Sequence, residues 1–213
     1  MKNQILYIFD PLCGWCYGFS ATMLKFYERY RDHYEFVAIP GGMVTGARVK
    51  PISEMEDFIS EAYERVEQRT GTPYGDAYLN GLLRSKTTLL DSEPPSRALH
   101  AFRSFHFERG IEFAHALQKA HYLEGKDFND ESVYRDLAKQ FDLEPETFMK
   151  RFREERIQSA MEQEFAWVSE SGIQGFPTVV CRYREKYYLL AHGYCPLAKL
   201  EESLERAKSM MIS

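Results

Sequence analysis

Two cysteines separated by two residues are the positions in this sequence that could most readily do chemistry. Cys13 and Cys16 enclose Gly14 and Trp15. The pair comes directly after an apolar, strand-like run and before a segment with helical spacing of its apolar residues. We therefore expect Cys13 at a helix N-terminus, where unpaired backbone N–H groups and the helix dipole favour a thiolate. Because the thiolate is the nucleophilic form, this position predicts thiol–disulfide exchange.

A zinc site is the main chemical alternative for the same cysteines. Cys13 and Cys16 could combine with His192 and Cys195, which have H-x-x-C spacing, to supply the four ligands of a structural site. The second pair lies far along the chain and lacks the glycines and turns of a zinc ribbon, so we expect no metal. Cys181 stands among strand-forming residues and is expected to be a buried, inert thiol.

The composition of the 213-residue chain indicates a folded protein with an acidic balance. Hydrophobic residues make up 44%, and the net charge of −5 provides no basic face for nucleic acid or an anionic membrane. The N-terminal apolar run is too short for a signal peptide, and no run approaches the roughly 20 apolar residues of a membrane span. We expect a cytoplasmic monomer or homodimer without nucleic-acid or membrane partners.

The order of the predicted elements defines an α/β protein. Helices are predicted at 13–31, through most of 53–171 and from Pro196 onwards, and strands at 4–9, 36–39, 178–181 and 187–191. Without the helical block, the βαβ and ββα units form a thioredoxin-like fold with a four-stranded mixed sheet. We therefore predict a thioredoxin-like domain from residues 1–43 and 172–213, and an inserted α-helical domain from residues 44–171.

Two helix starts within the helical block carry recognisable signals. Ser53 and Glu56 fit a capping box. Ser92 precedes Pro94 and Pro95, and proline is well tolerated in the first turn of a helix. These signals predict helices that begin near residues 53 and 92.

A second motif, Gly175-Phe176-Pro177-Thr178, comes just before the third predicted strand. Only about 5–6% of X-Pro bonds are cis in folded proteins, so proline alone would predict a trans bond. In a thioredoxin fold, however, the proline at this place is cis and faces the redox pair. The preceding backbone groups are then free to pair with a substrate strand. The combination with Cys13 and Cys16 therefore favours a cis bond before Pro177.

Three segments together resemble the DsbA family, in particular its cytoplasmic FrnE-like branch. They are residues 10–18 around the cysteines, 121–127 within the helical block, and 172–178 around Pro177. The resemblance implies a thioredoxin fold with an inserted helical domain and thiol–disulfide oxidoreductase activity. It also implies protein or small-molecule thiols and disulfides as partners, and no bound cofactor, with glutathione as a candidate co-substrate.

The same resemblance implies a role for each residue of the two motifs. Cys13 would be the nucleophile, and Cys16 would resolve the mixed disulfide. Phe176 and Pro177 would dock the substrate, and Trp15 is a candidate apolar contact. These five residues form the candidate site.

The proton acceptor for the resolving cysteine is the least defined part of the candidate site. Many family members keep a buried acid on the first strand, six residues before the first cysteine. Tyr7 occupies that position here. By proximity along the sequence, Asp10 and His192 are the two candidates for this role.

Two other functions are compatible with the pattern. Kappa-type glutathione transferases and 2-hydroxychromene-2-carboxylate isomerases resemble this architecture and bind glutathione at the strand–helix junction. They need only one serine or cysteine there, so the presence of both Cys13 and Cys16 argues against them. Some DsbA-like cytoplasmic proteins act instead as adaptors that deliver clients to a protease, and an adaptor would need neither thiol.

Overall fold

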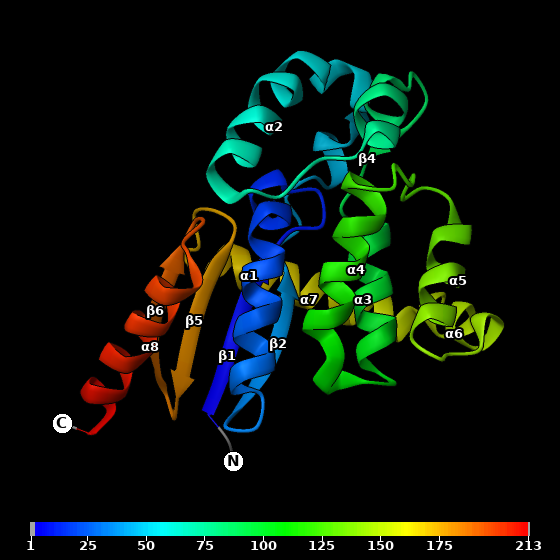
Figure 1. Ribbon diagram of the computed structural model, residues 1–213. Coiled ribbons are helices and arrows are strands. Elements are labelled where there is room, and N and C mark those ends of the chain that lie inside the picture. Colours follow the sequence, from blue (N-terminus) through cyan, green and yellow to red (C-terminus); the bar gives the residue numbers. More distant parts are fainter. Residues whose placement is uncertain (1–2, 213) are drawn as a thin grey trace.

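A mixed four-stranded sheet forms the centre of the protein. The computed structural model describes residues 3–212, so residues 1, 2 and 213 of the predicted domain ranges lie outside the described residues. The strands are β1 (Asn3–Phe9), β2 (Tyr34–Pro40), β5 (Thr178–Tyr183) and β6 (Lys186–His192). Their order is β2-β1-β5-β6, with β1 parallel to β2 and antiparallel to β5, as Figure 1 shows. The predicted four-stranded mixed sheet is confirmed.

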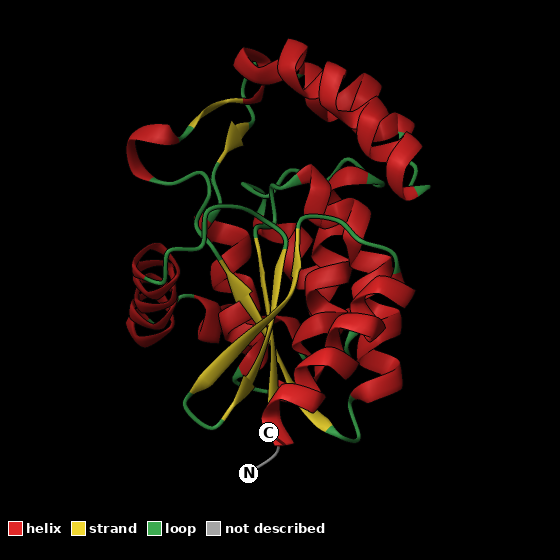
Figure 2. Ribbon diagram, turned by 90° about the vertical axis from the view of Figure 1, so that its left-hand side faces the viewer, coloured by secondary structure: helices red, strands yellow, loops and turns green. Residues whose placement is uncertain are grey.

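Helices cover both faces of this sheet. The predicted N- and C-terminal helices are α1 (Gly14–Tyr30) and α8 (Leu197–Ile212), and α7 (Glu155–Glu170) is the last helix before β5. Side chains alternate along β1, as expected for a strand buried on both faces. Ile5 and Tyr7 belong to the core cluster shared with α1 and α8, whereas Leu6 and Ile8 pack with Val168 of α7. Figure 2 shows the sheet between these helices.

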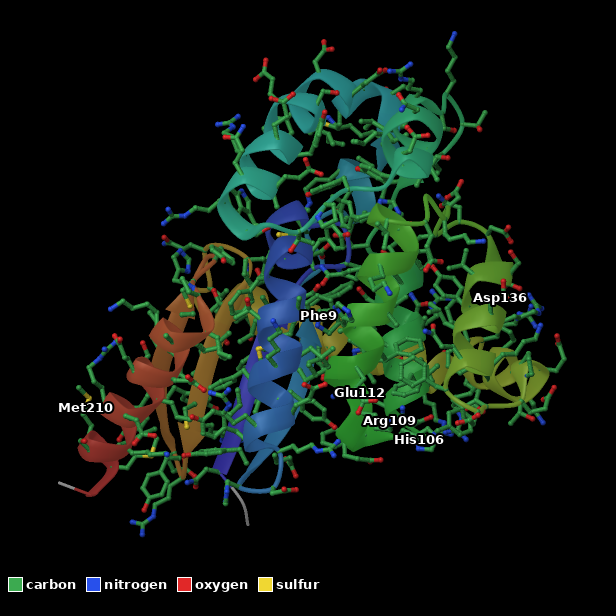
Figure 3. The ribbon with its side chains drawn as sticks, in the orientation of Figure 1. Phe9, His106, Arg109, Glu112, Asp136 and Met210 are labelled. Carbon is green, nitrogen blue, oxygen red and sulfur yellow. The ribbon has the colours of Figure 1, made fainter. Side chains whose placement is uncertain are left out.

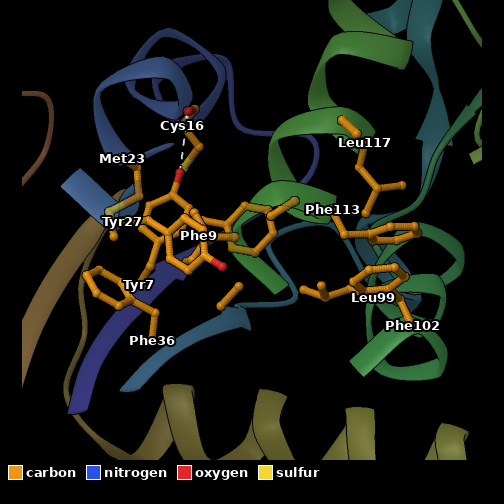
Figure 4. Packing of buried hydrophobic residues seen from close by; sticks show 14 of the residues in the cluster. Tyr7, Phe9, Cys16, Met23, Tyr27, Phe36, Leu99, Phe102, Phe113 and Leu117 are labelled. Carbon is orange, nitrogen blue, oxygen red and sulfur yellow. Dashed lines mark hydrogen bonds between the residues drawn. The ribbon is translucent and has the colours of Figure 1, made fainter. Parts of the chain in front are cut away.

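Four further helices of the insertion extend the core sideways from α1. They are α3 (Glu93–Arg103), α4 (Gly110–Tyr122), α5 (Glu131–Gln140) and α6 (Pro145–Phe152). Aromatic rings carry the core from the sheet to these helices, and Phe102 stacks on Phe113 with ring centres 4.2 Å apart. Figure 4 shows this continuity from Tyr7 and Phe9 through to Phe102. Because one cluster of buried side chains joins the two parts, the division into two domains stays a prediction.

The segment between β2 and α3 differs from the helical block that the sequence predicted. It contains β3 (Lys50–Pro51) and β4 (Leu89–Leu90), which pair antiparallel, and α2 (Glu56–Thr70), which lies across the top of Figure 1 above the start of α1. Two-residue strands are too short to produce an alternating pattern, so neither strand could be predicted from the sequence. Short 3₁₀ or π turns fill the connections at Gly46–Arg48, Ile52–Met55, Ala77–Gly81, Leu82–Arg84 and Phe107–Arg109.

Neither serine predicted to begin a helix caps one. The capping box at Ser53 was wrong, because residues Ile52–Met55 form a 3₁₀ turn and α2 begins at Glu56 without a side-chain cap. Ser92 does precede α3, but its hydroxyl makes no capping bond. It donates instead to a carboxylate far away in the sequence, as the next subsection describes.

The end of the molecule opposite α2 is held by ion pairs and aromatic contacts. Arg109 and Glu112 lie side by side there, as Figure 3 shows. The Nη2 atom of Arg109 is 2.8 Å from Oε2 of Glu112. The Tyr27 hydroxyl of α1 donates to the same carboxylate at 3.1 Å.

Within residues 3–212, no helix is both long enough and apolar enough to cross a membrane.

Candidate active site

The first cysteine lies at the start of α1. Cys13 is the N-cap residue, and the N–H of Cys16 donates to its Sγ at 3.3 Å. The Cys13 thiol donates in turn to the carbonyl oxygen of Phe176 at 3.7 Å. The first turn of α1 contains no acidic residue. The helix N-terminus therefore presents backbone donors and a favourable dipole to the Cys13 sulfur.

The two cysteines differ in burial and in electrostatic environment. Both are free thiols, Cys13 being 7% exposed and Cys16 fully buried. Burial raises the pKa of Cys16 well above its ordinary value and the neighbouring Cys13 raises it further, whereas a backbone hydrogen bond from Asp10 acts in the opposite direction. Cys16 is therefore held as a protonated thiol behind the more accessible cysteine.

The Phe176–Pro177 segment approaches the cysteines from the other side of the site. The peptide bond between these residues is cis. The Phe176 ring lies over the end of β2, where a Cβ on Gly41 would come within 2.0 Å of it. Glycine at residue 41 therefore allows the ring to pack there. Trp15, which is 37% exposed, lines the rim of the site together with Phe176.

Asp10 is fully buried at the turn that leads into the cysteine pair. Its carboxylate accepts hydrogen bonds from the N–H of Leu12 at 2.9 Å, the N–H of Met43 at 2.7 Å and the Ser92 hydroxyl at 2.9 Å. Burial raises the pKa of Asp10 to about 6, although these hydrogen bonds act in the opposite direction. Ser92 was not in the predicted site, since only the fold brings it to this carboxylate.

Tyr7 and His192 occupy different positions relative to the cysteines. The Tyr7 hydroxyl donates to the backbone carbonyl of Cys16 at 3.4 Å, as Figure 4 shows. Burial and the two cysteines raise the pKa of Tyr7 well above its ordinary value. His192 is exposed at the rim, where its Nδ1 lies 3.2 Å from the Thr178 hydroxyl. The backbone of Asp10 forms a hydrogen bond with the Cys16 thiol, but in the described part of the chain neither the Asp10 carboxylate nor the His192 ring does.

The other two cysteines lie in β5 and just before α8. Cys181 is fully buried, and burial raises its pKa to about 11. Cys195 is only partly buried. Among residues 3–212, no three or more His, Cys, Asp or Glu side chains are grouped so that they could hold a metal ion. The four residues of the zinc alternative are thus not gathered into one cluster there.

Two hollows meet at the rim of the site. The larger, about 800 Å³, lies between Cys13, α2 and α7 and is mostly apolar in its lining, which includes Met43, Phe58 and Phe165. The other, about 630 Å³, is lined by Trp15, Phe176, His192, Gly193 and Tyr194 together with Arg65, Gln68 and Arg69 of α2. Sequence reasoning missed the residues from α2, because the resemblance to the DsbA family is weakest in that part of the chain.

The sheet order, the helical insertion and a C-x-x-C pair at the start of α1 define a thiol–disulfide oxidoreductase fold of the DsbA type. The chain belongs to the thioredoxin family, whose family model matches residues 6–198. No curated protein matches the sequence.

Solved structures similar to this chain include a candidate protein disulfide isomerase from Nitrosomonas europaea, with 25% identity, 99% coverage of both chains and a TM-score of 0.87. The cytosolic disulfide reductase DsbM from Pseudomonas aeruginosa also has 25% identity, with 99% and 100% coverage and a TM-score of 0.82, and it has been solved with GSH. A 2-hydroxychromene-2-carboxylate isomerase, with 15% identity, 99% coverage of both chains and a TM-score of 0.64, shares the fold alone.

Proposed function

We propose that this protein is a cytoplasmic thiol–disulfide oxidoreductase that cycles Cys13 and Cys16 between dithiol and disulfide. One observation carries the proposal. The Cys13 sulfur caps α1 and accepts the N–H of Cys16, while the Cys16 thiol is fully buried one turn behind it. This arrangement supports one attacking sulfur and one resolving sulfur.

The reaction begins at the exposed edge of the pair. The Cys13 thiolate attacks one sulfur of a substrate disulfide, a new S–S bond forms, and the other substrate sulfur leaves as a thiolate. Cys16 then loses its proton and attacks the Cys13 sulfur, which releases the second substrate thiol. The substrate gains two electrons, and the protein becomes the Cys13–Cys16 disulfide. Two equivalents of an external thiol return the pair to the dithiol by the reverse steps.

Glutathione is the proposed co-substrate. The cytosolic reductase DsbM, which is similar to this chain, has been solved with GSH. Here the groove beside Trp15 carries Arg65 and Arg69, and no carboxylate residue lines it. Two guanidinium groups at this rim suit the carboxylates of a small anionic thiol. Phe176 and Pro177 are proposed to position its disulfide against Cys13.

Substitution of each cysteine tests the mechanism. Cys13→Ser should abolish reduction of insulin and of mixed disulfides with glutathione, because no attacking sulfur remains. Cys16→Ser should stop after the first step and accumulate a mixed disulfide on Cys13, detectable by mass spectrometry. Cys181→Ser is the matched control and should keep full activity, since its thiol is buried in β5. Full activity of Cys13→Ser would overturn the proposal.

The same variants separate the alternative functions. A glutathione-dependent isomerase or transferase would keep its glutathione affinity and its turnover in Cys16→Ala, since it needs only one nucleophile at the helix start. A protease adaptor would recover the same partners in a pull-down when both cysteines are replaced. The N–H of Cys16 points to the Cys13 sulfur, and its buried thiol lies directly behind, which favours the dithiol mechanism over both.

A further inference from the structure

A tyrosine from the inserted segment reaches the start of α1. The Tyr74 hydroxyl lies directly over Gly14, so close that a Cβ on this glycine would be 2.7 Å from the phenol oxygen. Residue 14 therefore has to be small for the tyrosine to occupy this place. Tyr74 and Cys13 also line the same cavity. The hydroxyl thus lies beside the reactive end of the C-x-x-C pair.

The position of Tyr74 is fixed by its neighbours. Its ring makes edge contacts with Tyr17 and Tyr122, with ring centres 5.1 and 5.3 Å away. Its N–H donates to Glu67 at 2.6 Å. The next residue, Gly75, packs against the end of α4. A Cβ on Gly75 would lie 1.7 Å from the carbonyl oxygen of Leu123. These contacts leave the phenol little freedom to turn away from Gly14.

The Tyr74 hydroxyl forms no hydrogen bond with another described residue, and Tyr74, which is 8% exposed, lines the cavity that contains Cys13. The neighbouring Tyr17 hydroxyl, in contrast, donates to the carbonyl of Pro73 at 2.7 Å. Buried phenols usually find a partner. Burial and the nearby Cys13 also raise the pKa of Tyr74 above its ordinary value, so the group remains a protonated donor.

The chemistry of Cys13 creates a need for such a donor. As a thiol, Cys13 donates to the carbonyl of Phe176. As a thiolate it has no proton to donate, and the carbonyl oxygen then repels it. The sulfur must turn to donors, of which the N–H of Cys16 is one. Gly14 and Trp15 supply no cationic group, so a side-chain donor has to come from elsewhere in the fold.

We propose that the Tyr74 hydroxyl donates a hydrogen bond to the Cys13 thiolate and so sets the pH at which this cysteine becomes reactive. The inference rests on the proposed function, in which Cys13 is the attacking sulfur. It makes the segment after α2 part of the active site, with Gly14 as the residue that admits the phenol.

Replacement of Tyr74 by phenylalanine tests this role, because it removes only the hydroxyl. The readout is the rate of Cys13 alkylation by iodoacetamide as a function of pH, in a Cys16→Ala, Cys181→Ser and Cys195→Ser background. Since a hydrogen bond to a charged sulfur is worth on the order of one pH unit, the midpoint should rise by about one unit and the rate below it should fall about tenfold. The limiting rate at high pH should stay unchanged. Tyr78→Phe, in the same tyrosine cluster, is the control and should leave the midpoint in place.

A second variant keeps the test decisive if packing changes. Gly14→Ala should displace the phenol and raise the midpoint as Tyr74→Phe does, whereas adding it to Tyr74→Phe should have little further effect. An unchanged midpoint in folded Tyr74→Phe, or fully additive effects of the two substitutions, would overturn the inference. These measurements need no turnover. A failure of the oxidoreductase assignment would appear instead as absent disulfide reduction by the unmodified protein.

Discussion

At the scale of single residues, Asp10 stands where the acid–base chemistry of the cysteine pair can be controlled. Its pKa is raised to about 6 by burial, close to the pH at which a proton acceptor works best. Tyr7, which takes the place of the family's buried acid, has its pKa raised away from neutrality and is a poor acceptor. His192 bonds to Thr178 at the rim. We therefore propose Asp10, rather than His192, as the acceptor of the Cys16 proton.

The first residue-scale prediction concerns the resolving step. In the unmodified protein, the release of a preformed Cys13–glutathione mixed disulfide by Cys16 should speed up as pH rises through about 6, because the Asp10 carboxylate becomes available. Asp10→Asn should remove this inflection and slow the step at pH 7 about 100-fold. Rapid-quench mass spectrometry of the mixed disulfide provides the measurement.

Ser92→Ala is the matched variant for that experiment. It removes one hydrogen bond that stabilises the charged form of Asp10, so the inflection should move to higher pH while the step itself survives. An inflection that persists in Asp10→Asn would exclude this carboxylate as the acceptor.

At the scale of elements, the packing of α2 on α1 decides the shape of the site. A Cβ on Gly18 of α1 would lie 2.7 Å from a methyl group of Val66 and 2.8 Å from one of Thr70. The Thr72 hydroxyl also donates to the Gly18 carbonyl at 3.2 Å. Glycine at residue 18 therefore lets α2 approach, and α2 in turn carries the two arginines of the rim and leads into the segment that contains Tyr74.

Gly18→Ala tests this contact by opposing two effects. Alanine within a helix normally adds about 1 kcal/mol of stability over glycine, but overpacking a tight contact costs about 1–3 kcal/mol. We expect overpacking to dominate and the free energy of unfolding in urea to fall. Gly81→Ala is the control, since a Cβ there meets nothing within 4 Å. Equal or higher stability of Gly18→Ala would show that α2 can move aside without penalty.

At the scale of the whole molecule, a core shared with the sheet holds the insertion in place, and a buried polar side chain lies within the insertion itself. His121 of α4 bonds through Nδ1 to the carbonyl of Lys126 at 3.1 Å and stacks on Phe128. Burial lowers its pKa to about 4. The native state therefore binds a proton less readily than the unfolded chain does between pH 6.5 and 4. The contribution of the neutral His121 side chain to the free energy of unfolding is complete above pH 6.5 and is lost as pH falls towards 4.

His121→Phe should reveal this dependence. The phenyl ring keeps the stack on Phe128 but leaves the Lys126 carbonyl without its donor, so the variant should be less stable at pH 7. Its disadvantage relative to the unmodified protein should shrink by about 3 kcal/mol between pH 7 and pH 4, because the two proteins differ only in whether residue 121 titrates. Urea denaturation at each pH measures the difference. A gap that stays constant with pH would contradict a buried, neutral His121.

The four strands of the central sheet, the helices at both ends and the two motifs could be predicted from the sequence alone, because these depend on local spacing. The C-x-x-C pair follows a strand and opens a helix, and five buried apolar residues of β1 mark a strand covered on both faces. From these elements and their order, the mixed sheet could be predicted.

The surroundings of the C-x-x-C pair, in contrast, depend on contacts between segments that are far apart in the sequence. Ser92 reaches Asp10 from 82 residues away, and Tyr74 reaches Gly14 from a loop after α2. No local pattern encodes such contacts, since they depend on how α2 and α3 pack around the start of α1. The predicted helix cap at Ser53 failed for a related reason, because residues 52–55 adopt a 3₁₀ turn between β3 and α2. The reactive cysteines and Asp10 were thus visible in the sequence, whereas the places of Ser92 and Tyr74 beside them were not.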